Sequence, residues 1–361
     1  MPLLPRLVSL FLVTALCLPG IAPADDAPAA GQNIPTASNY ALDGMAPAGR
    51  WAARLMLLRN SYDHRFDDAK NRVDMDTSAN VQIQGLGFTD ATVDTRVTTD
   101  MTELMLGYGV SENLTVGMIL PYARTTSRVT VSGTQAAALQ GSLSGLGYAP
   151  LQTTTASGLG DPTVGALWRF HKSARDSALL GVGIRFGSPV EDAPNNLADI
   201  PPGDGSTDLR LRGEYFRDLG NGWDLRLMGE YQRQLADSVI ARPTLLLPAE
   251  KLDRDLGDFW ETDIEIGKSF GNWRISGTWH RYKEAADRYT SRIGSDTSPL
   301  SSNTNTLADQ LRLGLTWSGI QTWREGRLFM PLIIKLEVQD AVSGRNFVDV
   351  RDVYLRVTSF F

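Results

Sequence analysis

The chain has 361 residues, and its 35 Lys and Arg against 41 Asp and Glu give a formal net charge of −6. This acidic balance excludes the basic signature of a nucleic-acid-binding protein, so we expect no nucleic acid among its partners. The mean hydropathy is slightly negative. A membrane protein has such a value only if polar residues alternate with apolar ones along its membrane segments.

Residues 1–24 have the pattern of a secretory signal peptide. Arg6 supplies the positive start, Leu7 to Leu18 form a short apolar core, and Ala22-Pro23-Ala24 offers a cleavage site. The apolar core is too short for a membrane-spanning helix, which needs about 20 apolar residues. Cleavage removes one positive charge, that of Arg6, so the net charge moves from −6 to −7. It also removes Cys17, the only cysteine.

Residues 25–48 are rich in proline and are expected to form a flexible periplasmic segment, which could also enter the following domain as a plug. Residues 49–361 break into about twelve amphipathic segments near the ten residues that a tilted membrane strand needs. The expected strands are 50–59, 97–109, 114–124, 159–170, 177–187, 207–217, 223–235, 258–270, 273–283, 308–318, 329–339 and 350–361. The pattern predicts an all-β protein, a transmembrane antiparallel up-and-down β-barrel with short periplasmic turns and long extracellular loops.

The hairpin from Glu261 to Tyr282 tests this fold, because a two-residue turn at Gly271-Asn272 fixes which residues lie opposite each other. The predicted pairs are Phe270 with Trp273 and Ile264 with Trp279 on one face, and Asp263 with His280 and Glu265 with Thr278 on the other. One face is apolar and aromatic near the turn, as a lipid-facing surface requires. In the preceding hairpin, a three-residue turn around Gly220 would place Glu214 opposite Arg226 and Arg210 opposite Glu230.

The polar faces of these strands predict a charged barrel lumen. The lumen-lining candidates are Arg210, Arg212, Glu214, Arg226, Glu230, Glu261, Asp263, Glu265, His280, Arg312 and Arg356. Charges withdrawn from water must be paired or hydrated, so these residues either brace the barrel as ion pairs or select solutes. The sequence does not separate the two roles.

The C-terminal strand alternates apolar and polar residues and ends on Phe361. A last strand of this kind resembles the signal read by the bacterial barrel-assembly machinery. We therefore expect the assembly machinery and outer-membrane lipids as partners, and the bacterial outer membrane as the location.

Few residues are suited to catalysis or metal binding. The chain has three histidines, and only His280 falls on the predicted lumen face. Ser276 lies four residues from it, about 13 Å along the strand at 3.3 Å per residue, which is too far for activation of the hydroxyl. We expect no catalytic residues, no metal site and no cofactor.

Several phrases resemble the outer-membrane transporter family named after the meta-pathway of phenol degradation. They are Gly107-Tyr108-Gly109-Val110-Ser111-Glu112-Asn113-Leu114, Leu120-Pro121-Tyr122, Gly158-Leu159-Gly160-Asp161-Pro162 and Gly165-Ala166-Leu167-Trp168-Arg169-Phe170. The resemblance covers roughly residues 40–361 and implies a barrel that admits hydrophobic or aromatic compounds. An insertion at Gln135 to Thr155 departs from it.

The sequence thus predicts an outer-membrane channel for passive uptake of a small-molecule solute, and no enzyme. Two alternatives remain open: a closed barrel with a structural or adhesive role, and an enzyme that modifies membrane lipids.

Overall fold

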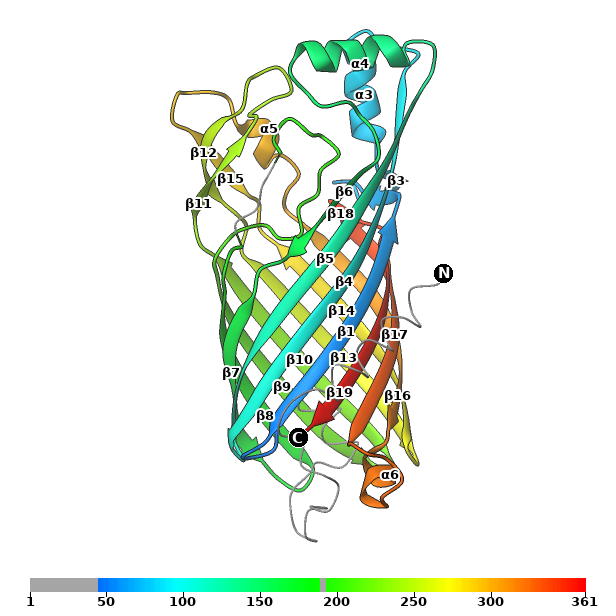
Figure 1. Cartoon of the computed structure of the whole chain (residues 1–361), viewed down its shortest axis with the longest axis vertical. Helices are drawn as coiled ribbons and strands as arrows, with labels where there is room; N and C mark the ends of the chain where they lie inside the picture. The colour runs from blue at the N-terminus through cyan, green and yellow to red at the C-terminus, as the bar shows by residue number, and fades with distance from the viewer. Residues whose placement is uncertain (1–44, 189–192) are drawn as a thin grey trace.

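The computed structural model describes residues 45–188 and 193–361. The predicted signal peptide, 1–24, and nearly all of the predicted periplasmic segment, 25–48, lie outside these residues. Within them, one antiparallel sheet closes into a barrel of twelve strands (Figure 1). The strands are β1 (Trp51–Tyr62), β4 (Thr92–Ser111), β5 (Leu114–Ser132), β7 (Thr163–Lys172), β8 (Asp176–Arg185), β9 (Asp208–Gly220), β10 (Trp223–Gln234), β13 (Phe259–Phe270), β14 (Trp273–Glu284), β16 (Leu307–Ser318), β17 (Leu332–Arg345) and β19 (Arg351–Phe360).

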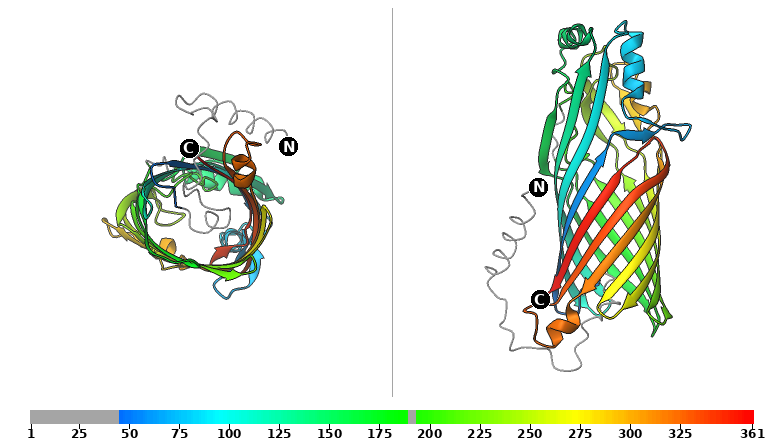
Figure 2. Two further views of the ribbon diagram at one scale, coloured as in Figure 1. Left: turned by 90° about the horizontal axis from the view of Figure 1, so that it is seen from below. Right: turned by 90° about the vertical axis from the view of Figure 1, so that its right-hand side faces the viewer.

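The barrel closes because β1 pairs with β4 on one side and with β19 on the other. Seen along its axis, the wall is a continuous ring (Figure 2). A short strand, β6 (Thr154–Leu159), pairs with the extracellular part of β5, beyond the part of β5 that pairs with β7. Closure gives each of the twelve barrel strands a partner on both sides, which is what a barrel needs in a membrane that offers its backbone no water. The predicted fold class is confirmed.

Most of the long connections lie at the end of the barrel opposite Phe361, the extracellular end (Figure 1). We expected loops there, and the structure instead builds two small sheets and three helices. The elements are β2 (His64–Phe66), β3 (Arg72–Asp74), β18 (Phe347–Val348), β11 (Asp237–Ala241), β12 (Glu250–Asp255), β15 (Arg288–Ser291), α3 (Thr77–Gly85), α4 (Ala136–Gly145) and α5 (Ser298–Ser301). The insertion at 135–155 is therefore largely helical. A further helix, α6 (Ile320–Arg324), lies at the periplasmic end. No helix in the described part of the chain is long and apolar enough to cross a membrane.

The predicted register of the β13–β14 hairpin is confirmed. Phe270 lies opposite Trp273 and Asp263 lies opposite His280. The register of the β9–β10 hairpin was wrong, because Glu214 lies opposite Met228 and Arg226 opposite Phe216. The turn is shorter than expected and carries a register shift between Trp223 and Asp224. Three consecutive turn residues, Gly220 to Gly222, have positive φ, which makes this tight turn feasible.

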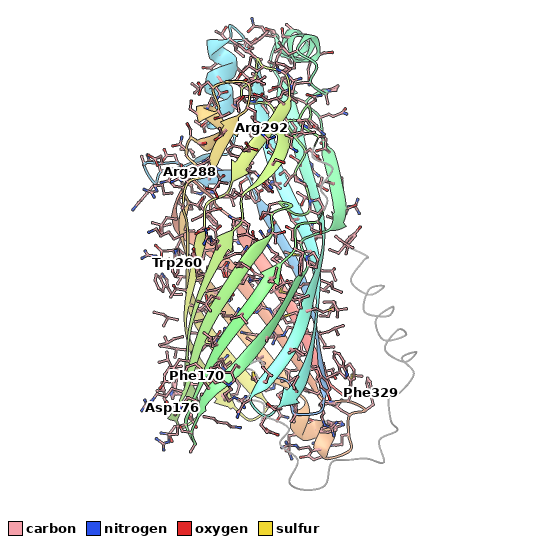
Figure 3. All side chains as sticks on the ribbon, turned by 90° about the vertical axis from the view of Figure 1, so that its left-hand side faces the viewer. Phe170, Asp176, Trp260, Arg288, Arg292 and Phe329 are labelled. Atoms are coloured by element: carbon pink, nitrogen blue, oxygen red, sulfur yellow. The ribbon has the colours of Figure 1, made fainter. Side chains whose placement is uncertain are left out.

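The outward face of the barrel is apolar, with aromatic residues near its ends. Trp223, Phe270 and Trp273 are exposed beside the periplasmic turns. Figure 3 shows Phe170 near that end and Trp260 toward the other. Between them, outward leucines, valines and isoleucines such as Ile264 are exposed. An exposed apolar belt between aromatic girdles is typical of a barrel surrounded by lipid.

A row of inward-facing glycines crosses four strands in register. Gly107 pairs with Gly117, Gly117 with Gly165, and Gly165 with Gly183. A Cβ at Gly165 would lie 2.5 Å from the carbonyl oxygen of Val182, closer than a real Cβ approaches. Glycine at this position therefore allows the strands to approach closely, and we infer that it permits a local bend rather than only leaving space in the lumen.

Candidate functional site

The barrel encloses a cavity of about 820 Å³, lined by inward-facing side chains from the whole circumference. Its charged lining residues are Arg54, Glu103, Arg210, Arg212, Glu214, Arg226, Glu230, Glu261, Asp263, Arg312, Lys335, Asp352 and Arg356, with His280. All the sequence-derived candidates line this cavity except Glu265, which is buried among neighbouring side chains. Strand alternation brings these residues together, because every second side chain points inward.

Part of the lining consists of a bridged cluster on β9 and β10. Arg210 Nε donates to Glu230 Oε1 at 2.8 Å. Arg212 Nε donates to Glu214 Oε1 at 2.5 Å, and its Nη1 lies 3.3 Å from Glu230 Oε2. Arg226 Nη2 lies 3.0 Å from Glu214 Oε2. The two ion pairs expected across this hairpin therefore exist, although they run diagonally because the register differs from the predicted one.

A second cluster centres on Asp263 of β13. His280 Nδ1 lies 2.7 Å from Asp263 Oδ1, while Arg226 and Arg312 approach Oδ2 at 3.9 and 3.8 Å. One carboxylate thus faces three nitrogen-bearing side chains from neighbouring strands. Such sharing fixes the positions of long side chains that would otherwise move across the lumen.

A third cluster lies on the inward face of β10, β13, β14 and β17. Arg274 of β14 donates to Asp224 Oδ1 and to Glu265 Oε1, both at 2.6 Å. Lys335 of β17 lies 3.6 Å from Glu265 Oε2 and 2.9 Å from Glu337 Oε1. The side chains of Arg274, Asp224 and Glu265 are at most 6% exposed. Their burial indicates a bracing role for this cluster, and explains why Glu265 does not reach the cavity.

The candidate set omitted residues that also line the cavity. Met56, Met101 and Met105 line it from β1 and β4, and Tyr354 lines it from β19. The same alternation rule finds them, but a search for charged residues overlooks methionine and tyrosine. They give a polar lumen apolar and aromatic patches.

The periplasmic end of the lumen receives the start of the described chain. Met45 and Ala46 are buried, and Met45 packs against Leu179 and Phe216. The Ala46 N–H donates to Thr115 Oγ1 at 3.0 Å. The chain therefore contacts the inside of the barrel before it enters β1.

Among residues 45–188 and 193–361, no group of three or more His, Cys, Asp or Glu side chains is arranged to hold a metal ion. The His280–Asp263 pair has two members, which is short of a metal site.

Comparison with known families gave one match: the model described as "Putative MetA-pathway of phenol degradation" matches residues 66–321. A search of curated proteins gave no match. Among solved structures, an outer membrane channel from Pseudomonas putida F1 has 14% identity and a TM-score of 0.59, and the match covers 87% of this chain and 96% of that one. The monoaromatic hydrocarbon channel CymD has 10% identity and a TM-score of 0.40 over 94% of both chains. The translocator domain of the autotransporter NalP from Neisseria meningitidis has 10% identity and a TM-score of 0.45, over 90% of this chain and 91% of that one.

Proposed function

We propose, from the premise that this chain belongs to the phenol-degradation family whose model it matches, that it is a passive outer-membrane channel for small molecules, aromatic ones in particular. The observation that carries the proposal is that the two faces of the barrel wall differ in chemistry. An apolar belt faces outward, while charged side chains surround an internal cavity of about 820 Å³. A wall of this kind places a polar path inside a lipid-compatible shell.

The fold and the family support this reading from different directions. The Pseudomonas putida protein with the same fold is described as an outer membrane channel. The family description refers to phenol degradation, which requires that a small aromatic compound enter the cell. Passive diffusion needs no cofactor and no catalytic group, and we expect no enzymatic activity.

Assembly of the barrel involves its last strand, and we propose that the machinery recognises β19 with Phe361. The main chain of Phe361 exchanges two hydrogen bonds with Trp51, at 2.9 and 3.0 Å. The preceding Phe360 is buried among Ala46, Ala52 and Ile333. The C-terminal residues therefore form the seam that closes the barrel.

Solute flux into liposomes tests the proposal. The protein purified from outer membranes is reconstituted, and swelling is followed in isotonic solutions of phenol-sized solutes and of oligosaccharides. Swelling with the small solutes but not with the large ones is the expected result. A folded, heat-modifiable barrel that admits none of them would contradict the channel and favour the closed structural or adhesive alternative.

A further inference from the structure

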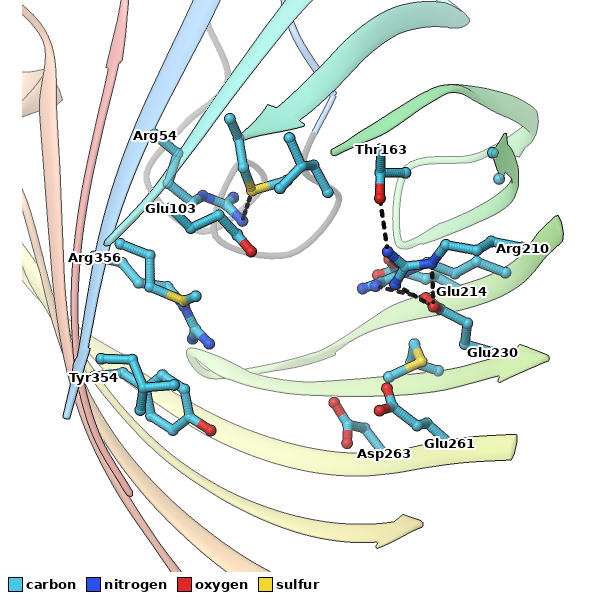
Figure 4. A pocket seen from close by; sticks show the side chains of 18 of the residues that line it. Arg54, Glu103, Thr163, Arg210, Glu214, Glu230, Glu261, Asp263, Tyr354 and Arg356 are labelled. Carbon is cyan, nitrogen blue, oxygen red and sulfur yellow. Dashed lines mark hydrogen bonds and ion pairs between the residues drawn. The ribbon is translucent and has the colours of Figure 1, made fainter. Parts of the chain in front are cut away.

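The two sides of the lumen differ in charge. One wall is formed by the neighbouring strands β16, β17, β19 and β1. Its inward-facing charged residues are Arg54, Arg312, Lys335, Arg356, Glu337 and Asp352, so cations outnumber carboxylates. On β9, β10 and β13 the carboxylates outnumber the arginines. Figure 4 shows Arg54 and Arg356 on one side of the cavity, and Glu230 and Glu261 on the other.

On the wall formed by β16, β17, β19 and β1, Arg54 is the cation with the least neutralisation by carboxylates. Its Nε lies 3.3 Å from Thr358 Oγ1, and its Nη1 lies 3.8 Å from the thioether sulfur of Met105. Within the described parts of the chain, no carboxylate oxygen lies within 4.0 Å of its guanidinium. A guanidinium has five N–H donors, and a hydroxyl and a sulfur satisfy few of them. The remaining donors are available to a solute.

Arg356 extends this donor surface from the adjacent strand. Met56 lies opposite Arg356 and Arg54 opposite Thr358, so the two arginines are diagonal neighbours across the β1–β19 seam. Arg356 pairs with Glu337, but that carboxylate also binds Lys335 at 2.9 Å. Its Nε otherwise lies 3.5 Å from the Met56 sulfur. The two guanidinium groups therefore face the same side of the cavity, where Glu103 also lies (Figure 4).

An aromatic surface lies beside the two arginines. The guanidinium carbon of Arg356 is 4.9 Å from the centre of the Tyr354 ring, and that of Arg312 is 5.7 Å from it. Met56 and Met105 line the same part of the cavity. Thioether groups pack favourably against aromatic rings, so this area suits a planar apolar body next to a charged group.

We propose that this wall binds an aromatic carboxylate, with its carboxylate on Arg54 and Arg356 and its ring against Tyr354 and the two methionines. The inference rests on the proposed channel function and names the solute class. Carboxylate and guanidinium match in a bidentate geometry, which gives strong and oriented binding. A neutral hydrocarbon gains nothing from the arginines. Glu103, on β4, faces the same space and opposes an anion there.

Benzoate block of single-channel current tests the site, using the protein purified from outer membranes in planar bilayers. We expect benzoate to block the current, and R54Q and R356Q each to weaken the apparent affinity by roughly tenfold or more, as loss of a charged hydrogen bond predicts. E103Q should strengthen block. The matched control is R281Q, which removes an arginine on the outward face that pairs with Asp309. It should leave block unchanged.

The possible outcomes test the benzoate site and the channel function separately. Absence of current from the unaltered folded protein would reject the channel. Current that benzoate does not block, or blocks equally in R54Q and R356Q, would reject the site and leave the channel intact. Equal block by phenol and benzoate would also reject it, because the arginines then make no distinction. Heat-modifiable migration checks folding of each variant. If R54Q does not fold, R54K keeps the charge but loses the bidentate geometry, and should show an intermediate affinity.

Discussion

Arg274 of β14 lies opposite Ser269 but extends along the hairpin to Glu265 of β13, where its Nη2 donates to Glu265 Oε1 at 2.6 Å. The same arginine also binds Asp224 at 2.6 Å, so one buried cation neutralises carboxylates from two other strands. Removing it would leave Asp224 buried without its arginine, and Glu265 with Lys335 as its remaining cationic partner. Breaking such an interaction costs far more than the pair contributes when it is intact.

We therefore predict that Arg274→Gln lowers the free energy of unfolding by about 3–5 kcal/mol. Urea unfolding in phospholipid vesicles, followed by tryptophan fluorescence, measures this change. The control is Arg281→Gln on the outer surface, where the arginine is 46% exposed and pairs with Asp309. Exposed pairs contribute less than about 1 kcal/mol, so this variant should be nearly neutral. Equal losses in both variants would contradict the bracing role of Arg274.

A charge on the lipid face provides a second test. Ile264 lies midway along β13 and is exposed on the outward face. Arginine there should lower the unfolding free energy by roughly 2–4 kcal/mol, because a charge at the membrane midplane loses hydration. Ile293 is 80% exposed in an extracellular connection, and Ile293→Arg should have no measurable effect. An unaffected Ile264→Arg protein would show that this belt does not contact lipid.

The glycine row predicts a local steric effect. Gly165→Ala places a methyl group 2.5 Å from the Val182 carbonyl oxygen, and we expect a loss of about 1–3 kcal/mol as the strands separate. Gly213 offers a matched control on β9, since a Cβ there meets nothing within 4 Å. Gly213→Ala should be neutral in the same unfolding assay. A neutral Gly165→Ala would reject the close approach of the strands.

Low pH should destabilise the small extracellular sheet that contains β2 and β3. The Arg96 hydrogen bond, followed by that from His64, lowers the pKa of Asp63 from 3.8 to about 2. Because the folded-state pKa is depressed, the stabilisation is present above about pH 4 and is lost as the pH falls toward 2. The protection of the backbone amides of residues 64–74 from hydrogen exchange, relative to an unfolded chain at the same pH, should therefore fall over this range. In Arg96→Gln, the loss of protection should begin at higher pH, because the pKa of Asp63 is then less depressed. The same pH dependence in both proteins would reject the role of the Asp63–Arg96 pair.

The sequence predicted the membrane part of this fold better than the extracellular part. In β13 and β14, alternation and the two-residue turn at Gly271-Asn272 determine which side chains meet, since both rules act locally. The β9–β10 register depended on the conformation of Gly220 to Gly222, which composition alone does not specify. α3 lacks acidic residues in its first turn, basic residues in its last turn and a side-chain cap. Nothing local marks such a helix, and its tertiary packing comes from Ile83, which contacts the apolar cluster that includes Val93 and Leu139.

For the candidate site, the sequence indicated which side chains face inward but only some of their contacts. Parity identified the inward charges, because one strand is enough to assign a face. The hairpin register identified His280 as a partner of Asp263, but nothing in the sequence identified the approach of Arg226 and Arg312 to the same carboxylate. These contacts join strands that are distant in sequence, and they depend on barrel curvature and side-chain length. For the same reason, sequence alone did not reveal that Glu265 is buried among neighbouring side chains and does not line the cavity.

The most direct test of the central claim, that solutes pass through the charged lumen, uses a cysteine introduced at Met228. This residue lines the cavity, while its neighbour Leu227 faces outward, and the only natural cysteine is Cys17. Single-channel conductance is recorded before and after a charged thiol reagent. Met228→Cys should show a clear fall in conductance, and Leu227→Cys should show none. Conductance that stays the same in Met228→Cys after complete modification, or that is absent from the folded protein, would contradict passage through the lumen.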